Sequence, residues 1–489
     1  MPVNAKDWLS LYASNVPDCQ LQQLQLDSRK VAPGDVFLAI PGVQQHGKQF
    51  IQQALTQGAA LVLTDEGQYS DERVLVLPEL MQLLPALAAN FYQQPARKLQ
   101  LVGITGTNGK SSTAFFVNQL VEQLQQKAAV IGTLGYGEPD QLKAHTGLTT
   151  PDVVGVHHLL HELRQHQFDT VCIEASSIGL EQRRLACVSI DVALFTNLSQ
   201  DHLDYHGDMA AYGRSKMILA SWPTLRLAVV NADDSFGMEF LANVQRRNID
   251  CSAVGRADSA ECQILSVAHQ ENGQRIELKI NGASTQIDTP MIGEFNADNM
   301  ALVFATLIRL GYDASQVKSA LAEVTPAPGR MQHIEGEPAV VVDYAHTPDA
   351  LEKTLLALRP FANKRQGKLW VVFGCGGDRD RSKRPLMGAA AADKADFVVV
   401  TSDNPRSEKP ENILQEIVDG IDKARQDKLH VEVDRVRAIE FAVAKASAKD
   451  VVLLAGKGHE STQTIGTQVI AHSDAQCAMT ALAKRGAHA

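Results

Sequence analysis

The chain has 489 residues, of which 45% are apolar and 21% charged, and its formal net charge is −10. That length predicts two to four domains with separate cores. The acidic balance argues against a general nucleic-acid binder, because phosphate backbones favour a basic surface. The chain shows neither a signal-like leader nor an apolar run approaching about 18 residues, and its seven cysteines are scattered without metal-site spacing. We therefore expect a cytoplasmic protein with reduced thiols and no membrane insertion. Separately, we expect a monomer.

The first part of the chain, residues 1–98, alternates short strands with helices. A turn at Pro33, Gly34 and Asp35 precedes the apolar run 36–40, which is the pattern of a strand entered from a tight turn. We expect a small α/β domain here.

From Leu99 the pattern becomes strand, glycine-rich turn and helix. The strand 99–105 leads into the turn 106–112, and residues 113–126 are apolar at helical spacing. Further strands that end in polar or small residues are DTVCIEAS, DVALFTNLS and LAVVNAD. Strands of this kind, separated by helices, predict a parallel sheet covered on both faces. We place a central domain at 99–327.

Pro326, Pro328 and Gly329 interrupt the pattern and predict a hinge, so a third domain is expected at 328–489. Its apolar strands run straight into polar loops in AVVVDYAHTP, KLWVVFGCGGDRD, ADFVVVTSDNPR and DVVLLAGKGHE. An open parallel sheet collects ligands at the carboxyl ends of its strands. We therefore expect a second α/β sheet, Rossmann-like, with its chemistry in these loops.

The strongest local signal is GITGTNGKSS, residues 103–112, between a strand and a helix. Its glycines allow backbone N–H groups to approach phosphate, Lys110 supplies charge, and Ser111 can bind magnesium. The segment departs from the common P-loop spacing, because Ile104 stands where a glycine is usual. It nevertheless predicts a phosphate site.

Acidic and imidazole side chains follow two later strands of the central domain. Glu174 closes one strand, and the loop 196–208 contains Asp201 and His202. Beside a phosphate loop, such groups suit a magnesium-nucleotide site, and we favour Glu174 and His202 as metal ligands. Lys216 lies on an expected helix capped by Asp208, and its spacing alone does not single it out.

Three basic residues follow strands of the third domain: Arg379, Arg406 and Lys457. Guanidinium groups match carboxylate and phosphate oxygens, whereas single arginines such as Arg29 or Arg184 are common on surfaces. The third domain is therefore expected to bind an anionic or zwitterionic ligand.

Ten motifs in order resemble the Mur ligase family: GITGTNGKSS, TTPD, EASSIGLEQRR, NLSQDHLDYHGD, GEFNADN, PGRMQ, DYAHTPD, FGCGGDRD, DNPR and AGKGHE. The resemblance spans nearly the whole chain. It implies a UDP-binding first domain, a central P-loop-type ATPase domain and a Rossmann-like third domain that binds an amino acid. The implied activity uses ATP and Mg²⁺ to add meso-2,6-diaminopimelate to UDP-N-acetylmuramoyl-L-alanyl-D-glutamate through an acyl phosphate, in peptidoglycan precursor synthesis. The alternative within the family is the L-lysine-adding ligase.

The resemblance also implies the site residues. The catalytic residues are Lys110, Glu174, His202 and Lys216, the last carbamylated to N6-carboxylysine, and the metal ligands are Ser111, Glu174, His202 and Lys216. ATP is expected at Gly106, Thr107, Asn108, Gly109, Lys110, Ser111, Ser112, Asn296, Asn299, Arg330, Asp343, Tyr344 and His346. The UDP-muramoyl dipeptide is expected at Leu26, Ser28, Val43, Gln44, Gln45, Thr149, Thr150, Ser176, Gln182 and Arg184. Diaminopimelate is expected at Arg379, Asp403, Asn404, Pro405, Arg406, Gly456 and Glu460.

Two positions depart from the family pattern: Leu148 replaces a frequent asparagine and Ile178 a frequent histidine. They bear on dipeptide binding rather than on the reaction. A non-catalytic precursor-binding protein would be expected to lose Lys110, Glu174, His202 or Lys216, and all four are present. A folylpolyglutamate synthase would share the phosphate loop, but the DNPR loop and the long first domain argue against it.

Overall fold

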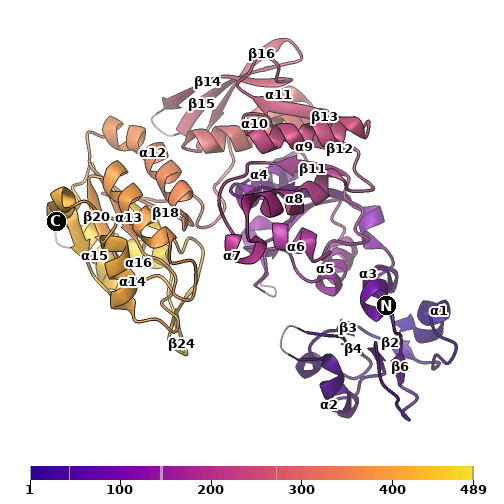
Figure 1. The fold of residues 1–489 in the computed structure, drawn as a ribbon. Coiled ribbons are helices and arrows are strands. Elements are labelled where there is room, and N and C mark those ends of the chain that lie inside the picture. The colour runs from indigo at the N-terminus through magenta and orange to yellow at the C-terminus, as the bar shows by residue number, and fades with distance from the viewer. Residues whose placement is uncertain (1, 43–44, 144–146, 271–272, 487–489) are drawn as a thin grey trace.

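The computed structural model describes residues 2–42, 45–143, 147–270 and 273–486. Within these ranges the chain forms three large sheets that follow one another along the sequence, and Figure 1 shows them as separate bodies with helices packed around them. The predicted three-domain α/β architecture is confirmed. No helix in these ranges is both long and apolar enough to cross a membrane.

The first domain is built on a parallel four-stranded sheet in the order β3-β4-β5-β6, beside the antiparallel pair β1-β2. Its strands are β1 (Val3–Asn4), β2 (Gln20–Leu21), β3 (Leu24–Gln25), β4 (Val36–Ala39), β5 (Leu61–Thr64) and β6 (Val74–Val76). Its α-helices are α1 (Ala5–Leu9), α2 (Ile51–Thr56) and α3 (Leu80–Phe91). Strand β4 begins directly after the predicted turn at 33–35.

The central domain carries a ten-stranded sheet in the order β16-β15-β14-β13-β12-β11-β7-β10-β8-β9. Its strands are β7 (Gln100–Thr105), β8 (Ala128–Gly132), β9 (Gly135–Gly137), β10 (Thr170–Glu174), β11 (Val192–Phe195), β12 (Leu227–Asn231), β13 (Asp250–Gly255), β14 (Cys262–Gln270), β15 (Gly273–Ile280) and β16 (Ala283–Thr289). Its helices are α4 (Lys110–Gln123), α5 (Val153–Gln165), α6 (Ser177–Glu181), α7 (Leu203–His206), α8 (Met209–Ala220), α9 (Ser235–Arg246), α10 (Glu294–Arg309) and α11 (Ala314–Leu321).

Both faces of the central sheet are buried, because alternate residues of one strand enter opposite cores. Leu194 of β11 packs with α4, α10 and α11, whereas Phe195 packs with α5, α6, α8 and α9. The strands from β13 to β8 are parallel, as predicted, but β14, β15 and β16 form an antiparallel extension that the sequence pattern did not indicate. Figure 1 shows this extension at the top of the molecule.

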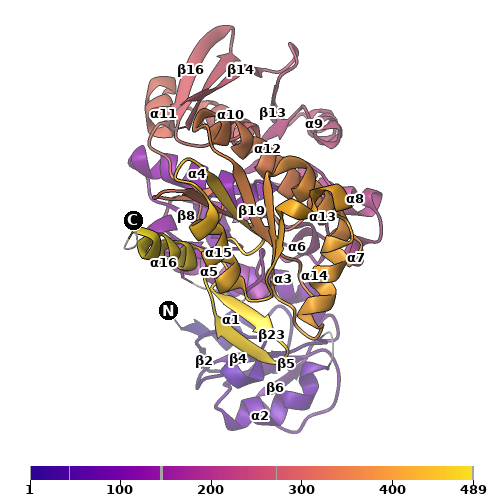
Figure 2. The same cartoon turned by 90° about the vertical axis from the view of Figure 1, so that its left-hand side faces the viewer.

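The third domain has a six-stranded sheet in the order β17-β18-β22-β19-β20-β21, in which only β17 is antiparallel among the described strands. Its strands are β17 (Gln332–Ile334), β18 (Ala339–Asp343), β19 (Leu369–Phe373), β20 (Phe397–Val400), β21 (Leu429–Val431) and β22 (Val451–Ala455), with a hairpin of β23 (Thr462–Ile465) and β24 (Gln468–Ala471). Figure 2 shows this hairpin extending away from the sheet. Helices α12 (Pro348–Lys364), α13 (Lys383–Lys394) and α14 (Pro410–Val418) cover one face, and α15 (Arg435–Lys445) and α16 (Asp474–Gly486) cover the other.

Candidate active site

A cavity of about 720 Å³ lies where the carboxyl ends of the central strands face the third domain. The central domain contributes the loop after β7, the loop after β11 and the first turns of α10. The third domain contributes Arg330, the loop after β18 and one side of α12. The cavity therefore opens at the end of the sheet where the sequence placed the phosphate loop.

The phosphate loop is held in shape by its neighbours. Gly109 has a left-handed φ of +87°, and a Cβ there would lie 2.7 Å from Oδ1 of Asn299. The Asn108 carbonyl accepts a hydrogen bond from Oγ1 of Thr196 at 2.6 Å, and the Asn108 N–H donates to Oδ1 of Asn197 at 3.0 Å. Helix α4 starts at Lys110, so its free N–H groups face the cavity.

Two lysines converge on one carbonyl of this loop. Nζ of Lys110 donates to the Gly106 carbonyl at 2.9 Å, and Nζ of Lys216 donates to the same oxygen at 2.7 Å. Lys216 is only 1% exposed and lies over the Tyr212 ring at 4.3 Å. Burial lowers the pKa of both amines, and the charge of Lys110 lowers the pKa of Lys216 further, well below its ordinary value. Lys216, which spacing alone could not distinguish, is therefore a buried amine with an enlarged unprotonated fraction.

Glu174 is a buried carboxylate on the cavity wall. Its Oε1 accepts from Oγ of Ser111 at 2.8 Å and from the Thr133 N–H at 3.0 Å. His202 also lines the cavity, with Nε2 3.5 Å from the Asp201 carboxylate. In the part of the chain that the structure describes, no group of three or more His, Cys, Asp or Glu side chains is placed to hold a metal. Any magnesium site here must therefore use few side chains, completed by water and phosphate oxygens, as magnesium commonly does.

The other expected ATP residues line the same cavity: Asn296, Asn299, Arg330, Asp343, Tyr344 and His346. The Arg330 guanidinium stacks on the Tyr344 ring at 4.2 Å. Asp343 lines the cavity, and its carboxylate accepts from the Met331 and Ala345 N–H groups at 2.8 and 3.0 Å. It therefore also stabilises the backbone at these two residues. Burial raises the pKa of Asp343, and Arg330 partly offsets this.

Sequence reasoning left many residues of the cavity wall unnamed, among them two basic or imidazole side chains from outside the motifs. His269 reaches the cavity from β14 and Lys353 from α12. Neither lies in a motif, and β14 belongs to the unpredicted antiparallel extension, so no local signal marked them.

The expected dipeptide residues form one hydrogen-bonded network next to Glu174. Thr150 donates to the Glu174 carbonyl at 2.6 Å and its hydroxyl lies 2.9 Å from that of Ser176. Arg184 donates to the Thr150 carbonyl at 2.8 Å and to Oε1 of Gln182 at 2.7 and 3.1 Å. Thr149 accepts from the Thr133 hydroxyl at 3.0 Å, which ties the network to Glu174.

The expected UDP residues lie in the first domain. Ser28 is buried and donates to Oε1 of Gln53 at 3.1 Å, and Gln45 is exposed. Leu26 is half-buried beside the domain core. Val43 and Gln44 fall outside the described residues.

The expected acceptor residues are brought together by loops that follow β19, β20 and β22. Asp403 and Asn404 are buried, Pro405 is buried beside them, and Arg379 is exposed. Nη1 of Arg406 donates to the Gly377 carbonyl at 2.7 Å. A Cβ on Gly456 would lie 2.9 Å from the carboxylate of Asp403, so the loops after β20 and β22 pack closely. Nδ2 of Asn404 donates to Oε2 of Glu460 at 2.8 Å.

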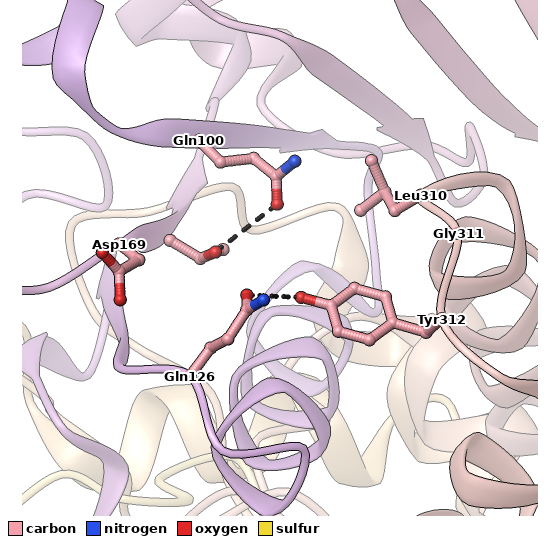
Figure 3. A pocket seen from close by; sticks show the side chains of 7 residues that line it. Gln100, Gln126, Asp169, Leu310, Gly311 and Tyr312 are labelled. Carbon is pink, nitrogen blue, oxygen red and sulfur yellow. Dashed lines mark hydrogen bonds between the residues drawn. The ribbon is translucent and has the colours of Figure 1, made fainter.

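A second hollow, of about 410 Å³, lies at the amino end of the central strands, opposite the phosphate loop (Figure 3). It is lined by Gln100, Gln126, Asp169, Thr170, Leu310, Gly311 and Tyr312. Its polar groups pair with one another: Tyr312 donates to Gln126 at 2.6 Å (Figure 3). Its described lining includes no basic side chain to meet phosphate, which favours the larger cavity as the candidate phosphate site.

Comparisons with known proteins match this architecture along most of the chain. The Mur ligase family, catalytic domain, matches residues 20–92, the Mur ligase middle domain residues 104–307, and the Mur ligase, glutamate ligase domain residues 329–458. A protein of Acidovorax sp. (strain JS42), named UDP-N-acetylmuramoyl-L-alanyl-D-glutamate--2,6-diaminopimelate ligase, is 42% identical over 99% of this chain and 97% of its own. A protein of the same name from Chromobacterium violaceum is 44% identical over 95% of each chain. A solved structure of a ligase with that name covers 99% of this chain and 100% of its own, with 33% identity and a TM-score of 0.70.

Proposed function

This chain belongs to the Mur ligase family, and we propose that it is an ATP-dependent amide ligase that adds meso-2,6-diaminopimelate to UDP-N-acetylmuramoyl-L-alanyl-D-glutamate. The observation that carries the proposal is its near-full-length identity to ligases of that name. The product is a peptidoglycan precursor, so the enzyme acts in cell-wall biogenesis, on which cell shape and division depend. We further propose that it works in the cytoplasm as a monomer.

The first step activates a carboxylate, which is by itself a poor electrophile. The glutamate side-chain carboxylate of the dipeptide attacks the γ-phosphorus of ATP, the bond from that phosphorus to the β-γ bridging oxygen breaks, and ADP and an acyl phosphate result. Lys110 and the amino end of α4 face the cavity where the phosphates bind and offset their charge. The dipeptide network around Thr150 lies beside Glu174, which supports delivery of the carboxylate to this point.

The donor set beside the loop fits magnesium. Ser111 and Glu174 present hydroxyl and carboxylate oxygens 2.8 Å apart, with His202 on the same cavity wall. Magnesium bound there supplies positive charge that polarises the γ-phosphate. We further propose that the unprotonated Lys216 nitrogen adds to CO₂ and loses a proton, which places an anionic carbamate beside Lys110. The low pKa of Lys216 supports this step, because only the unprotonated amine reacts.

In the second step the acceptor amine attacks the acyl carbon, a proton leaves the nitrogen, and phosphate departs with the C–O bonding electrons. The far end of diaminopimelate carries a carboxylate beside its ammonium, and a guanidinium such as that of Arg406 pairs with that carboxylate. The far end of L-lysine is only a cation, which Arg406 would repel. The presence of Arg406 in the acceptor loops therefore supports diaminopimelate over lysine.

The test is release of phosphate from ATP by the purified full chain with magnesium and UDP-N-acetylmuramoyl-L-alanyl-D-glutamate, with meso-diaminopimelate or L-lysine added in parallel. We expect release that depends on diaminopimelate and not on lysine. Release with lysine would overturn the acceptor assignment, and no release with either would reject the ligase. A folate-dependent release in a parallel reaction would favour the folylpolyglutamate synthase alternative.

A further inference from the structure

Lys457 differs from the other basic residues of the acceptor loops because it is fully buried. The side chain follows β22 directly and has 0% exposure. Its Nζ donates to Oε2 of Glu460 at 2.8 Å and to Oδ1 of Asn404 at 3.2 Å. A buried ammonium is costly unless it is paired and hydrogen-bonded. The sequence pattern suggested that Lys457 contacts a ligand. Its side chain instead points into the loops that form the site, where no ligand can reach it.

The contacts of Asn404 define the orientation of its side-chain amide between Lys457 and Glu460. Oδ1 of Asn404 also accepts from the Thr464 N–H at 3.0 Å, and a backbone N–H can only donate. The oxygen end of the amide therefore faces Lys457 and Thr464, and its nitrogen end donates to Oε2 of Glu460. Oε2 receives two donors, whereas Oε1 receives none from the described residues. The second carboxylate oxygen of Glu460 is thus left for a ligand.

Arg406 lies in the same loop as Asn404, and the β23–β24 hairpin is hydrogen-bonded to both residues. The Arg406 N–H donates to the Thr464 carbonyl at 3.1 Å, and the Gly466 N–H donates to the Arg406 carbonyl at 2.7 Å. Nε2 of Gln463 holds the Asp403 carbonyl at 2.7 Å. A displacement of Asn404 therefore moves the strand that carries Thr464 and, with it, the backbone of Arg406.

We propose that Lys457 is a positioning residue for acceptor recognition, which rests on the proposed function. Through Glu460 it directs one carboxylate oxygen toward the ammonium at the far end of the acceptor. Through Asn404 it stabilises the loop from which Arg406 reaches the neighbouring carboxylate. Lys457 does not line the larger cavity, and its side-chain hydrogen bonds among the described residues go to Asn404 and Glu460. We therefore expect its effect to fall mainly on the acceptor.

The test compares Lys457→Met and Lys457→Gln with the wild type in the full-length enzyme. Methionine keeps an unbranched chain without a donor, and glutamine keeps a donor that can reach Glu460. The matched control is Lys484→Met. It removes an exposed lysine on α16 of the same domain, which pairs with Glu440 of α15. For each protein, kcat and the KM for ATP, for the UDP-linked dipeptide and for meso-diaminopimelate are measured, and thermal unfolding checks the fold.

We expect Lys457→Met to raise the KM for diaminopimelate about tenfold to a hundredfold, as loss of a buried charged hydrogen bond does. The KM for ATP should stay within about twofold, and Lys457→Gln should recover part of the loss. In a Glu460→Gln background the further effect of Lys457→Met should shrink, because the residue acts through that carboxylate.

Equal increases in all three KM values, an undiminished effect in the Glu460→Gln background, or failure of both Lys457 variants to fold would overturn the positioning role. A control variant that shifted the diaminopimelate KM equally would do the same. A wild-type enzyme that consumed no ATP with any acceptor would instead reject the proposed function, so the two failures are distinguishable.

Discussion

A buried ion pair lies beneath the acceptor loops, and its contribution to the stability of the third domain can be tested quantitatively. Arg435 on α15 and Asp474 on α16 have fully buried side chains and form two hydrogen bonds, at 2.6 and 2.8 Å. Arg435 also donates to the carbonyls of Ser402, just before the DNPR loop, and Ala455, at the end of β22, at 3.3 and 2.9 Å. The substitution Arg435→Met removes all four bonds. Among the described residues, it leaves the buried Asp474 carboxylate with a side-chain partner only in His472.

Removing one partner of a buried ion pair costs about 3 to 5 kcal/mol of folding free energy, because the remaining charge stays desolvated. The three tryptophans lie one in each domain, at Trp8, Trp222 and Trp370. A background with Trp8→Phe and Trp222→Phe therefore makes fluorescence report on the third domain alone during urea unfolding, which avoids a two-state treatment of the whole chain.

The matched control is Arg437→Met, on the same helix, whose side chain is 75% exposed and should change stability by less than about 0.5 kcal/mol. Arg435 holds the pKa of Asp474 well below its usual range. The pair should thus make its full contribution to the free energy of unfolding at pH values above the pKa of an unfolded aspartate, about 3.9. This contribution should be lost as the pH falls further below that pKa. A loss below about 1 kcal/mol for Arg435→Met at neutral pH would refute the reasoning.

Three further substitutions test the reaction. Lys216→Ala should abolish turnover and be rescued partly by short carboxylic acids, and ¹³C NMR with labelled bicarbonate should show a carbamate signal in the wild type alone; an active, unrescued variant would contradict this. Arg406→Ala should raise the KM for diaminopimelate about tenfold to a hundredfold, and an unchanged preference over L-lysine would refute the pairing. Gly109→Ala should abolish ATP binding in a calorimetric titration, because φ is +87° and the new Cβ would meet Asn299; wild-type affinity would contradict this.

The conformation of the glycine-rich loop, where we propose that phosphate binds, was predictable because its determinants are local. The strand, the glycine-rich turn and the helix that begins at Lys110 follow one another directly, and a parallel sheet brings the ends of β7, β10 and β11 to one edge. The expected cap of α8 is confirmed for the same reason, since Asp208 accepts from the Ala211 N–H at 2.7 Å. Short-range geometry is sufficient for such features.

The antiparallel extension β14–β16 and the hairpin β23–β24 could not be predicted in the same way. Their strands mix exposed and buried residues, as in β14, where Leu265 is 41% exposed and Ile264 is buried. The sequence also does not show whether a side chain after a strand end points inward or outward. Lys457 and Arg406 are both basic residues that follow strands, yet Lys457 is buried and Arg406 is half-exposed. Only the tertiary contacts with Asn404 and Glu460 distinguish them.

The link between the central and third domains shows where movement between them must occur. Thr325 is fixed to α4, because its N–H and its carbonyl both bond to the Gln119 side chain, at 2.9 and 3.0 Å. Gly329 is fixed to the third domain, because a Cβ there would lie 2.1 Å from the His459 nitrogen. Ala327 is also fully buried in the core of the central domain, so the chain is anchored there beyond Thr325. A rotation of the third domain in the proposed reaction would therefore turn mainly about the backbone between Ala327 and Gly329. Pro328 lies in this stretch and its ring restricts φ, so few dihedral angles would be available to the rotation.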